Sequence, residues 1–95
     1  MLQVVDTSLS TQDFAAQGLV MAPNPANTAF TIQNELLKPI QEISVTDLSG
    51  KTIWKQQVST ESYYTVSTQN WSKGYYIVTV TQTDGHSFHS KLIVQ

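Results

Sequence analysis

The stretch that decides the fold is residues 75–83, Tyr-Tyr-Ile-Val-Thr-Val-Thr-Gln-Thr, which Asp84-Gly85 follows at once. This almost unbroken run of β-branched and aromatic residues predicts a strand, and its composition is typical of a central position in a sheet. An Asp-Gly pair between two strand-like runs is a strong hairpin signal, so residues 87–94 are predicted to pair antiparallel with it. Alternation along the strand places three side chains on one face: Tyr76, Val78 and Val80.

Shorter runs of the same kind come earlier in the chain and are separated by turn residues. Pro23-Asn24-Pro25 must end the first run, because each proline fixes φ and lacks a backbone donor. Asp47-Leu48-Ser49-Gly50-Lys51 is predicted to be a tight turn in which Gly50 takes a positive φ. The chain is therefore expected to be all-β, an immunoglobulin-like antiparallel β-sandwich of about seven strands. The earlier runs are residues 19–22, 28–33, 43–45, 52–58 and 64–66.

The first 18 residues differ from the rest of the chain. They are rich in Ser, Thr, Gln and Asp and show no sustained hydrophobic period. We therefore expect residues 1–18 to be a linker or tether to another domain and residues 19–95 to be the sandwich, with Phe14 and Leu19 anchoring the end of the linker.

Composition excludes several functional classes. The chain has 95 residues and a formal net charge of −2, it contains no Arg, and its five Lys are scattered along the sequence, so we expect no nucleic-acid partner. Cysteine is absent, which removes disulfides, thiol nucleophiles and thiolate metal ligands. No apolar run approaches the ~20 residues needed to cross a bilayer.

No catalytic or metal centre is expected from the residue pattern. His86 and His89 are three apart on a strand and should point to opposite faces, so they cannot easily share a metal ion. Asp84 could complete a Ser-His-Asp triad only with a nucleophile elbow, which the sequence lacks. The strand pattern would also suit a carbohydrate-binding or adhesion module, and Tyr63 and Tyr75 are the first candidates for its ligand-contacting aromatic residues.

Four motifs follow one another in a fixed order up to the last residue. They are Pro23-Asn24-Pro25-Ala26, Asp47-Leu48-Ser49-Gly50-Lys51, residues 71–80 (Trp-Ser-Lys-Gly-Tyr-Tyr-Ile-Val-Thr-Val) and Lys91-Leu92-Ile93-Val94-Gln95. Each motif is common by itself, whereas the four in this register are specific. Together they closely resemble the type A C-terminal sorting domain of type IX (Por) secretion cargo. The resemblance covers residues 19–95, and it departs from the family at Trp71, where an aliphatic residue is usual.

The resemblance implies a noncatalytic signal on proteins that gram-negative bacteria export, read in the periplasm and used to pass cargo through an outer-membrane translocon. The implied partners are the translocon and its shuttle proteins, a fused N-terminal cargo domain, and a sortase-like cysteine peptidase. That peptidase removes the domain, and the cargo is released or attached to lipopolysaccharide at the cell surface. No cofactor is implied.

Carried over residue by residue, recognition falls on Pro23, Asn24, Pro25, Gly50, Lys51, Gly74, Tyr76, Lys91, Leu92, Ile93, Val94 and Gln95. The prolines, glycines and Tyr76 also have a purely structural explanation, as strand breakers, flexible positions and core filler. For the last motif we expect an edge strand whose unpaired backbone groups allow a receptor to extend the sheet, with Lys91 setting the register.

Overall fold

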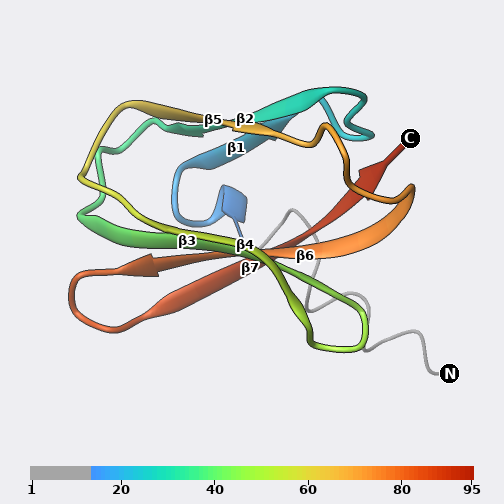
Figure 1. Ribbon diagram of the computed structural model, residues 1–95. Coiled ribbons are helices and arrows are strands. Elements are labelled where there is room, and N and C mark those ends of the chain that lie inside the picture. The colour runs from blue at the N-terminus through green and yellow to red at the C-terminus, as the bar shows by residue number, and fades with distance from the viewer. Residues whose placement is uncertain (1–13) are drawn as a thin grey trace, which may run out of the picture.

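Seven strands make up the computed structural model, which describes residues 14–95. They form a three-stranded sheet in the order β1-β2-β5 and a four-stranded sheet in the order β4-β3-β6-β7, with every strand pair antiparallel. The two sheets lie face to face (Figure 1), which confirms the predicted antiparallel sandwich. The strands are β1 (Leu19–Ala22), β2 (Ala29–Asn34), β3 (Ile40–Asp47), β4 (Thr52–Gln57), β5 (Tyr63–Ser67), β6 (Gly74–Gln82) and β7 (Ser87–Val94).

Strand β6 lies between β3 and β7, as its apolar composition predicts. Its alternate side chains enter the core, where Tyr76 is 5% exposed and both Val78 and Val80 are 0% exposed. The turn at Asp84-Gly85 connects β6 to β7, whose register runs from Thr81 opposite Ser87 to Gly74 opposite Val94. The predicted hairpin is therefore confirmed over its full length.

The core is built from the inward positions of both sheets. Phe30 and Ile32 of β2 face Ile43 and Val45 of β3, and all four are nearly fully buried. The packing also includes Phe14, which precedes β1 and is 1% exposed, and Leu19, which is 2% exposed. The expected anchoring by Phe14 and Leu19 is confirmed.

One aromatic cluster supports the start of β6. The Trp71 ring lies 6.4 Å from the Phe30 ring and 5.4 Å from the Tyr76 ring, measured between centroids. The Tyr76 hydroxyl donates a hydrogen bond to the backbone carbonyl of Ser72. Trp71 therefore fills the space between the two sheets and fixes the loop that leads into β6.

Over residues 14–95 no helix is long and apolar enough to span a membrane.

Candidate recognition site at one end of the four-stranded sheet

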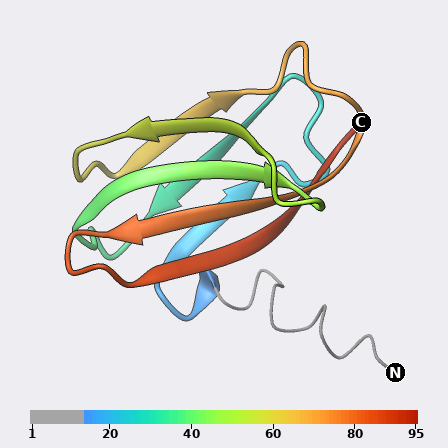
Figure 2. The same ribbon diagram turned by 60° about the horizontal axis from the view of Figure 1, so that its bottom comes forward.

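The four sequence motifs meet at one end of the four-stranded sheet. Asp47 at the end of β3 pairs with Tyr76 of β6, and Tyr76 pairs with Leu92 of β7. The turn between β3 and β4, the start of β6 and the end of β7 therefore lie together, and both ribbon views show them on the same side of the molecule (Figures 1 and 2). We call this region the motif end.

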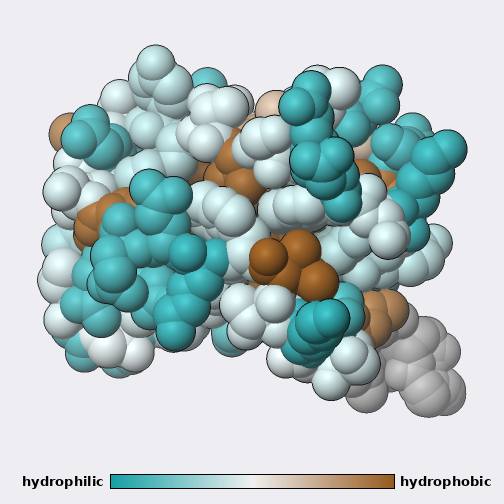
Figure 3. Space-filling view, viewed as in Figure 1, coloured by the Kyte–Doolittle hydropathy of each residue, from teal (hydrophilic) through white to brown (hydrophobic). Residues whose placement is uncertain are grey.

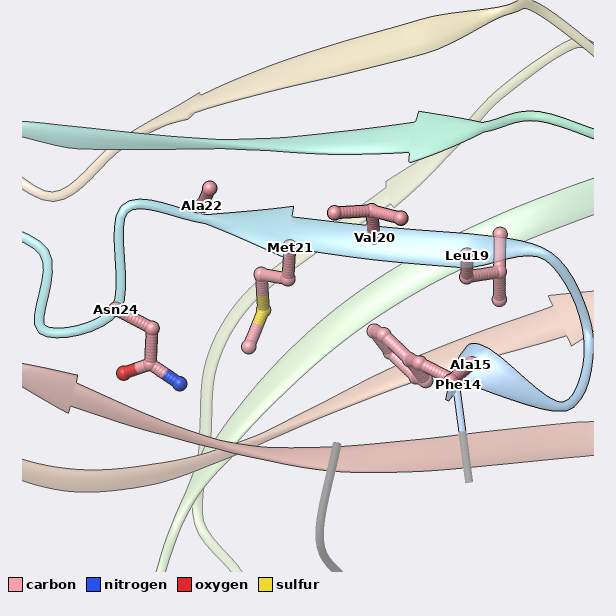
Figure 4. A pocket seen from close by; sticks show the side chains of 7 residues that line it. All are labelled: Phe14, Ala15, Leu19, Val20, Met21, Ala22 and Asn24. Carbon is pink, nitrogen blue, oxygen red and sulfur yellow. The ribbon is translucent and has the colours of Figure 1, made fainter. Parts of the chain in front are cut away.

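The Pro23-Asn24-Pro25-Ala26 corner reaches the motif end from the other sheet. Strand β1 stops at Ala22, as the prolines predict, and the corner then crosses to the outer edge of β7. The Asn24 Nδ2 donates to the carbonyl of Lys91 at 2.9 Å, and its Oδ1 accepts from the amide of Ile93 at 3.0 Å. The side-chain amide thus takes the place of one peptide unit of a neighbouring strand. Figure 4 shows Asn24 pointing from the corner toward β7.

The backbone of Ala26 continues the same contact. Its amide donates to the carbonyl of Ile93 at 2.7 Å, and its carbonyl accepts from the amide of Gln95 at 2.9 Å. Ala26 lies parallel to Val94 in an isolated bridge and is 0% exposed. We call these contacts of Asn24 and Ala26 with residues 91–95 the latch.

The latch corrects one expectation from the sequence. Strand β7 is an edge strand, as predicted, but its outer backbone groups are not unpaired near its end. Asn24 and Ala26 already occupy the carbonyl of Lys91, both backbone groups of Ile93 and the amide of Gln95. A receptor strand cannot add along residues 91–95 without displacing the corner. The expectation of an open backbone edge there is wrong because a segment distant in sequence covers it.

The turn between β3 and β4 is held by one carboxylate. Asp47 Oδ1 accepts hydrogen bonds from the Ser49 hydroxyl and from the amides of Ser49 and Lys51. These bonds, with the Ser49 hydroxyl contributing most, lower the pKa of Asp47 below its ordinary value. Gly50 has a φ of 93°, as the turn requires. The carboxylate therefore stays ionised at neutral pH, and Gly50 serves the turn conformation.

The predicted site residues range from buried, through half-buried at Gly74, Lys91 and Ile93, to exposed. Tyr76, Leu92 and Val94 are buried in the core, whereas the side chains of Lys51 and Gln95 are exposed. Gly74 begins β6 with a φ of 148° and pairs with Val94. The exposed prolines of the corner, Pro23 and Pro25, flank Asn24. A partner can therefore contact only the exposed part of the motif set. The buried residues act indirectly, because their packing in the core holds the exposed residues in position.

Side chains of β6 and β7 that point away from the core form the outer face of the motif end. Tyr75 pairs with Ile93, and Ile77 pairs with Lys91. The Lys91 Nζ lies 5.7 Å from the centroid of the Tyr75 ring, and Tyr75 is 53% exposed. This is a cation–π contact at the surface, which limits the freedom of the Lys91 side chain. The resemblance had marked Lys91 for recognition, whereas Tyr75 was named as part of the third motif and as a possible sugar platform, with no role in recognition.

The histidines lie at the other end of the same sheet. His86 is exposed and contacts Asp84, with Nδ1 at 3.0 Å from Oδ2, and the Thr79 hydroxyl lies 2.9 Å from His89 Nδ1. The backbone and side-chain hydrogen bonds from His86 lower the pKa of Asp84. In residues 14–95 no group of three or more His, Asp or Glu side chains gathers as a metal site would require.

Loss of the Asn24 side chain tests the latch. We expect Asn24→Ala to lower the free energy of unfolding by about 1–2 kcal/mol, because two hydrogen bonds worth roughly 0.5–1.5 kcal/mol each are lost. Chemical denaturation of the purified domain measures the change. The matched control is Asn27→Ala, an exposed position in the same loop. Equal stability of the two variants would show that the latch contributes nothing to the fold.

Sequence reasoning missed two features of this end. The role of Asn24 was not predicted, since its partners are 67 and 69 residues away. Ala26 carried no signal beyond its place in the corner, because a backbone contact leaves no trace in side-chain chemistry. A polar residue fixed between two prolines was the available clue, since such an arrangement holds a side chain in a defined direction.

Known proteins with similar structures share the fold of this chain. A DUF3244 family protein from Bacteroides vulgatus, with an immunoglobulin-like β-sandwich fold, superposes with a TM-score of 0.72 at 15% identity, covering 86% of this chain and 89% of that one. CopC from Methylosinus trichosporium superposes with a TM-score of 0.50 at 20% identity, covering 81% of this chain and 91% of that one. The first likeness confirms the predicted immunoglobulin-like architecture.

Similar sequences occur in much longer proteins. An ulvan lyase of Nonlabens ulvanivorans is 28% identical over 93 residues, and an endo-acting ulvan lyase of Formosa agariphila is 28% identical over 96 residues. The alignments cover 98% and 99% of this chain but only 17% and 18% of those proteins. The profile of the secretion system C-terminal sorting domain matches residues 20–95. The chain therefore belongs to the type IX (Por) secretion system C-terminal sorting domain family.

Proposed function

We propose that this chain is the noncatalytic address of an exported protein, read at the motif end by the type IX translocon and its shuttle proteins. The observation that carries the proposal is the convergence of all four motifs on one end of one sheet, in a chain that the family profile matches over residues 20–95. The family is one of secretion signals, so its members are found on proteins bound for the cell surface or the extracellular space.

The cargo would be a larger protein fused at the N-terminal side. The two ulvan lyases are similar to this chain over less than a fifth of their length, which leaves most of each protein for other work. A polysaccharide lyase is thus a reasonable cargo type for this chain. The sandwich itself would act only as the export address of that cargo.

The sorting domain is proposed to be removed by a sortase-like cysteine peptidase, which would cut the chain in or before residues 1–18. A peptidase needs accessible backbone in an extended form. From Phe14 onward that condition fails, because Phe14 is buried and the next turn is closed by hydrogen bonds to the carbonyls of Phe14 and Ala15. We therefore expect the cut N-terminal to Phe14. Mass spectrometry of the processed cargo locates the new terminus, and a terminus within residues 14–95 would contradict the prediction.

Export of a reporter tests the proposed function. A fluorescent protein preceded by an export signal and followed by residues 1–95 should reach the medium or cell surface of a type IX-competent host. The same reporter without the domain, and the complete fusion in a host lacking the translocon, should stay inside the cell. Retention of the complete fusion in the competent host, with the domain folded, would reject the address function.

A sugar-binding role is the second candidate, and one observation favours it. Tyr63 is 62% exposed and lines a shallow pocket with Gln33, Glu35 and Ser62, so a ring and several polar groups converge. Tyr75 is a poorer platform because Lys91 contacts its ring. Titration with ulvan oligosaccharides, with binding measured by isothermal titration calorimetry, separates the two functions. Binding that Tyr63→Ala removes and Tyr75→Ala keeps would support the sugar site.

A further inference from the structure

The motif end gathers most of the basic charge of the described residues. Lys51 follows the turn at the end of β3, Lys73 precedes β6, and Lys91 lies near the end of β7. These are three of the five lysines in the chain. The only acidic side chain among residues 14–95 at this end is Asp47, which is engaged within its own turn.

The opposite end of the sandwich carries the reverse charge. Glu35 follows β2, Glu61 precedes β5, and Asp84 lies in the turn between β6 and β7. Lys38 is the one lysine at that end. It lies near the turn between β6 and β7, because the amide of Thr83 donates a hydrogen bond to the carbonyl of Pro39, the residue that follows Lys38. The remaining charges of the described residues, Lys55 and Glu42, form an ion pair at 3.4 Å on the outer face of the four-stranded sheet. The domain is therefore polarised along its strands although its net charge is small.

Two exposed apolar side chains accompany the lysines. Leu48 at the tip of the turn is 65% exposed, and Tyr75 is 53% exposed. We call Leu48, Lys51, Lys73, Tyr75 and Lys91 the basic end. On the face seen in Figure 3, hydrophobic residues form only small patches between hydrophilic ones. Each of the two exposed side chains can add a small apolar contact beside the lysines of the basic end.

We propose that the basic end docks onto an acidic protein surface, and that this contact is how the translocon machinery reads the address. The inference rests on the proposed function and names the chemistry of its partner. The latch closes the alternative of strand addition along residues 91–95, so side chains must carry recognition there. Opposite charges at the two ends orient the domain as it approaches an acidic partner, which raises the rate of productive encounter.

A protein partner fits this surface better than a membrane does. Basic segments that hold proteins to anionic lipid generally carry about 4–8 lysines or arginines in one cluster. The basic end has three lysines, and the ionised Asp47 lies among them. The attraction to a lipid surface is correspondingly small.

The test divides the five lysines of the chain into a test set of three and a control set of two, each changed in the reporter fusion. Lys51→Gln, Lys73→Gln and Lys91→Gln together should lower export by about tenfold, as expected when several rim charges of a docking surface are lost. Lys38→Gln with Lys55→Gln, the control set, should leave export within about twofold of the unchanged domain, because surface charges outside an interface contribute little. Thermal melts establish that each variant is folded.

A conservative variant separates charge from shape. Replacing the same three lysines by arginine keeps the charge and should keep export. Normal export of the folded glutamine variant, or an equal loss in the control set, would overturn the inference. Failure of the unchanged fusion to be exported would instead count against the proposed function itself.

Vesicles of phosphatidylcholine with phosphatidylglycerol provide the lipid arm of the experiment. The purified domain should not bind them at physiological salt. Binding that the three glutamine substitutions abolish would assign the basic end to a lipid surface and overturn the proposal of a protein partner.

Discussion

Removal of residues 92–95 is expected to abolish export and to destabilise the domain severely. Leu92 is 0% exposed and Val94 is 3% exposed, so the deletion takes two aliphatic side chains out of the core. Their burial is worth roughly 1.5–3 kcal/mol each, and together they approach the lower end of the ~5–15 kcal/mol that separates folded from unfolded states. The deletion also removes the amides of Ile93 and Gln95, which bind Asn24 and Ala26.

The truncated fusion should therefore not be exported, and the truncated domain should show no cooperative thermal unfolding transition. Because Leu92 and Val94 are both buried, loss of export by this deletion cannot by itself be separated from loss of folding. Removal of Gln95 alone is the graded control, because its side chain is exposed and only its amide contacts Ala26. If the four-residue deletion is still folded and exports normally, the C-terminal address model is wrong for this chain.

Phe14→Ala is expected to lower the free energy of unfolding by about 3 kcal/mol, in the range typical of a buried Phe replaced by Ala. Phe14 is 1% exposed although it lies five residues before β1, where a linker was predicted. Its ring packs in the same core cluster as Leu19 and Met21, beside the pocket shown in Figure 4. Urea denaturation measures the loss.

Ala15→Ser is the control for Phe14→Ala, since Ala15 is exposed in the same turn and should tolerate the change. Unfolding of the Phe14→Ala domain at the wild-type urea concentration would mean that the ring adds nothing to the fold. The result also bears on processing. If Phe14 belongs to the folded unit, a peptidase that cuts N-terminal to it leaves the core of the removed domain intact.

Local signals in the sequence were sufficient for most of the fold. The β-branched run of β6 and the Asp84-Gly85 turn determine a hairpin from adjacent residues alone, and the structure has that hairpin. The corner prolines and Gly50 act through their own backbone angles, so their effects were also predictable. The full strand order was not predicted, because pairing between β3 and β6 joins segments that share no turn.

The contacts that shape the candidate site could not be predicted in the same way. Asn24 binds the backbone of Lys91 and Ile93, and any residue would offer the same groups at those positions. The gathering of Lys51, Lys73 and Lys91 depends on the register of β3, β6 and β7, whereas along the sequence these lysines are merely scattered. Long-range geometry, and not residue type, created both features.

The latch also makes the closed fold depend on two segments that are far apart in the chain. Asn24 and its partner carbonyl on Lys91 are separated by 67 residues. A polypeptide that lacks residues 91–95 cannot form these bonds, and it leaves the core without Leu92 and Val94. If export reads the closed latch, a chain truncated before β7 would be retained while a chain that contains all of β7 would pass, so the same contact would serve as a check that the domain is complete.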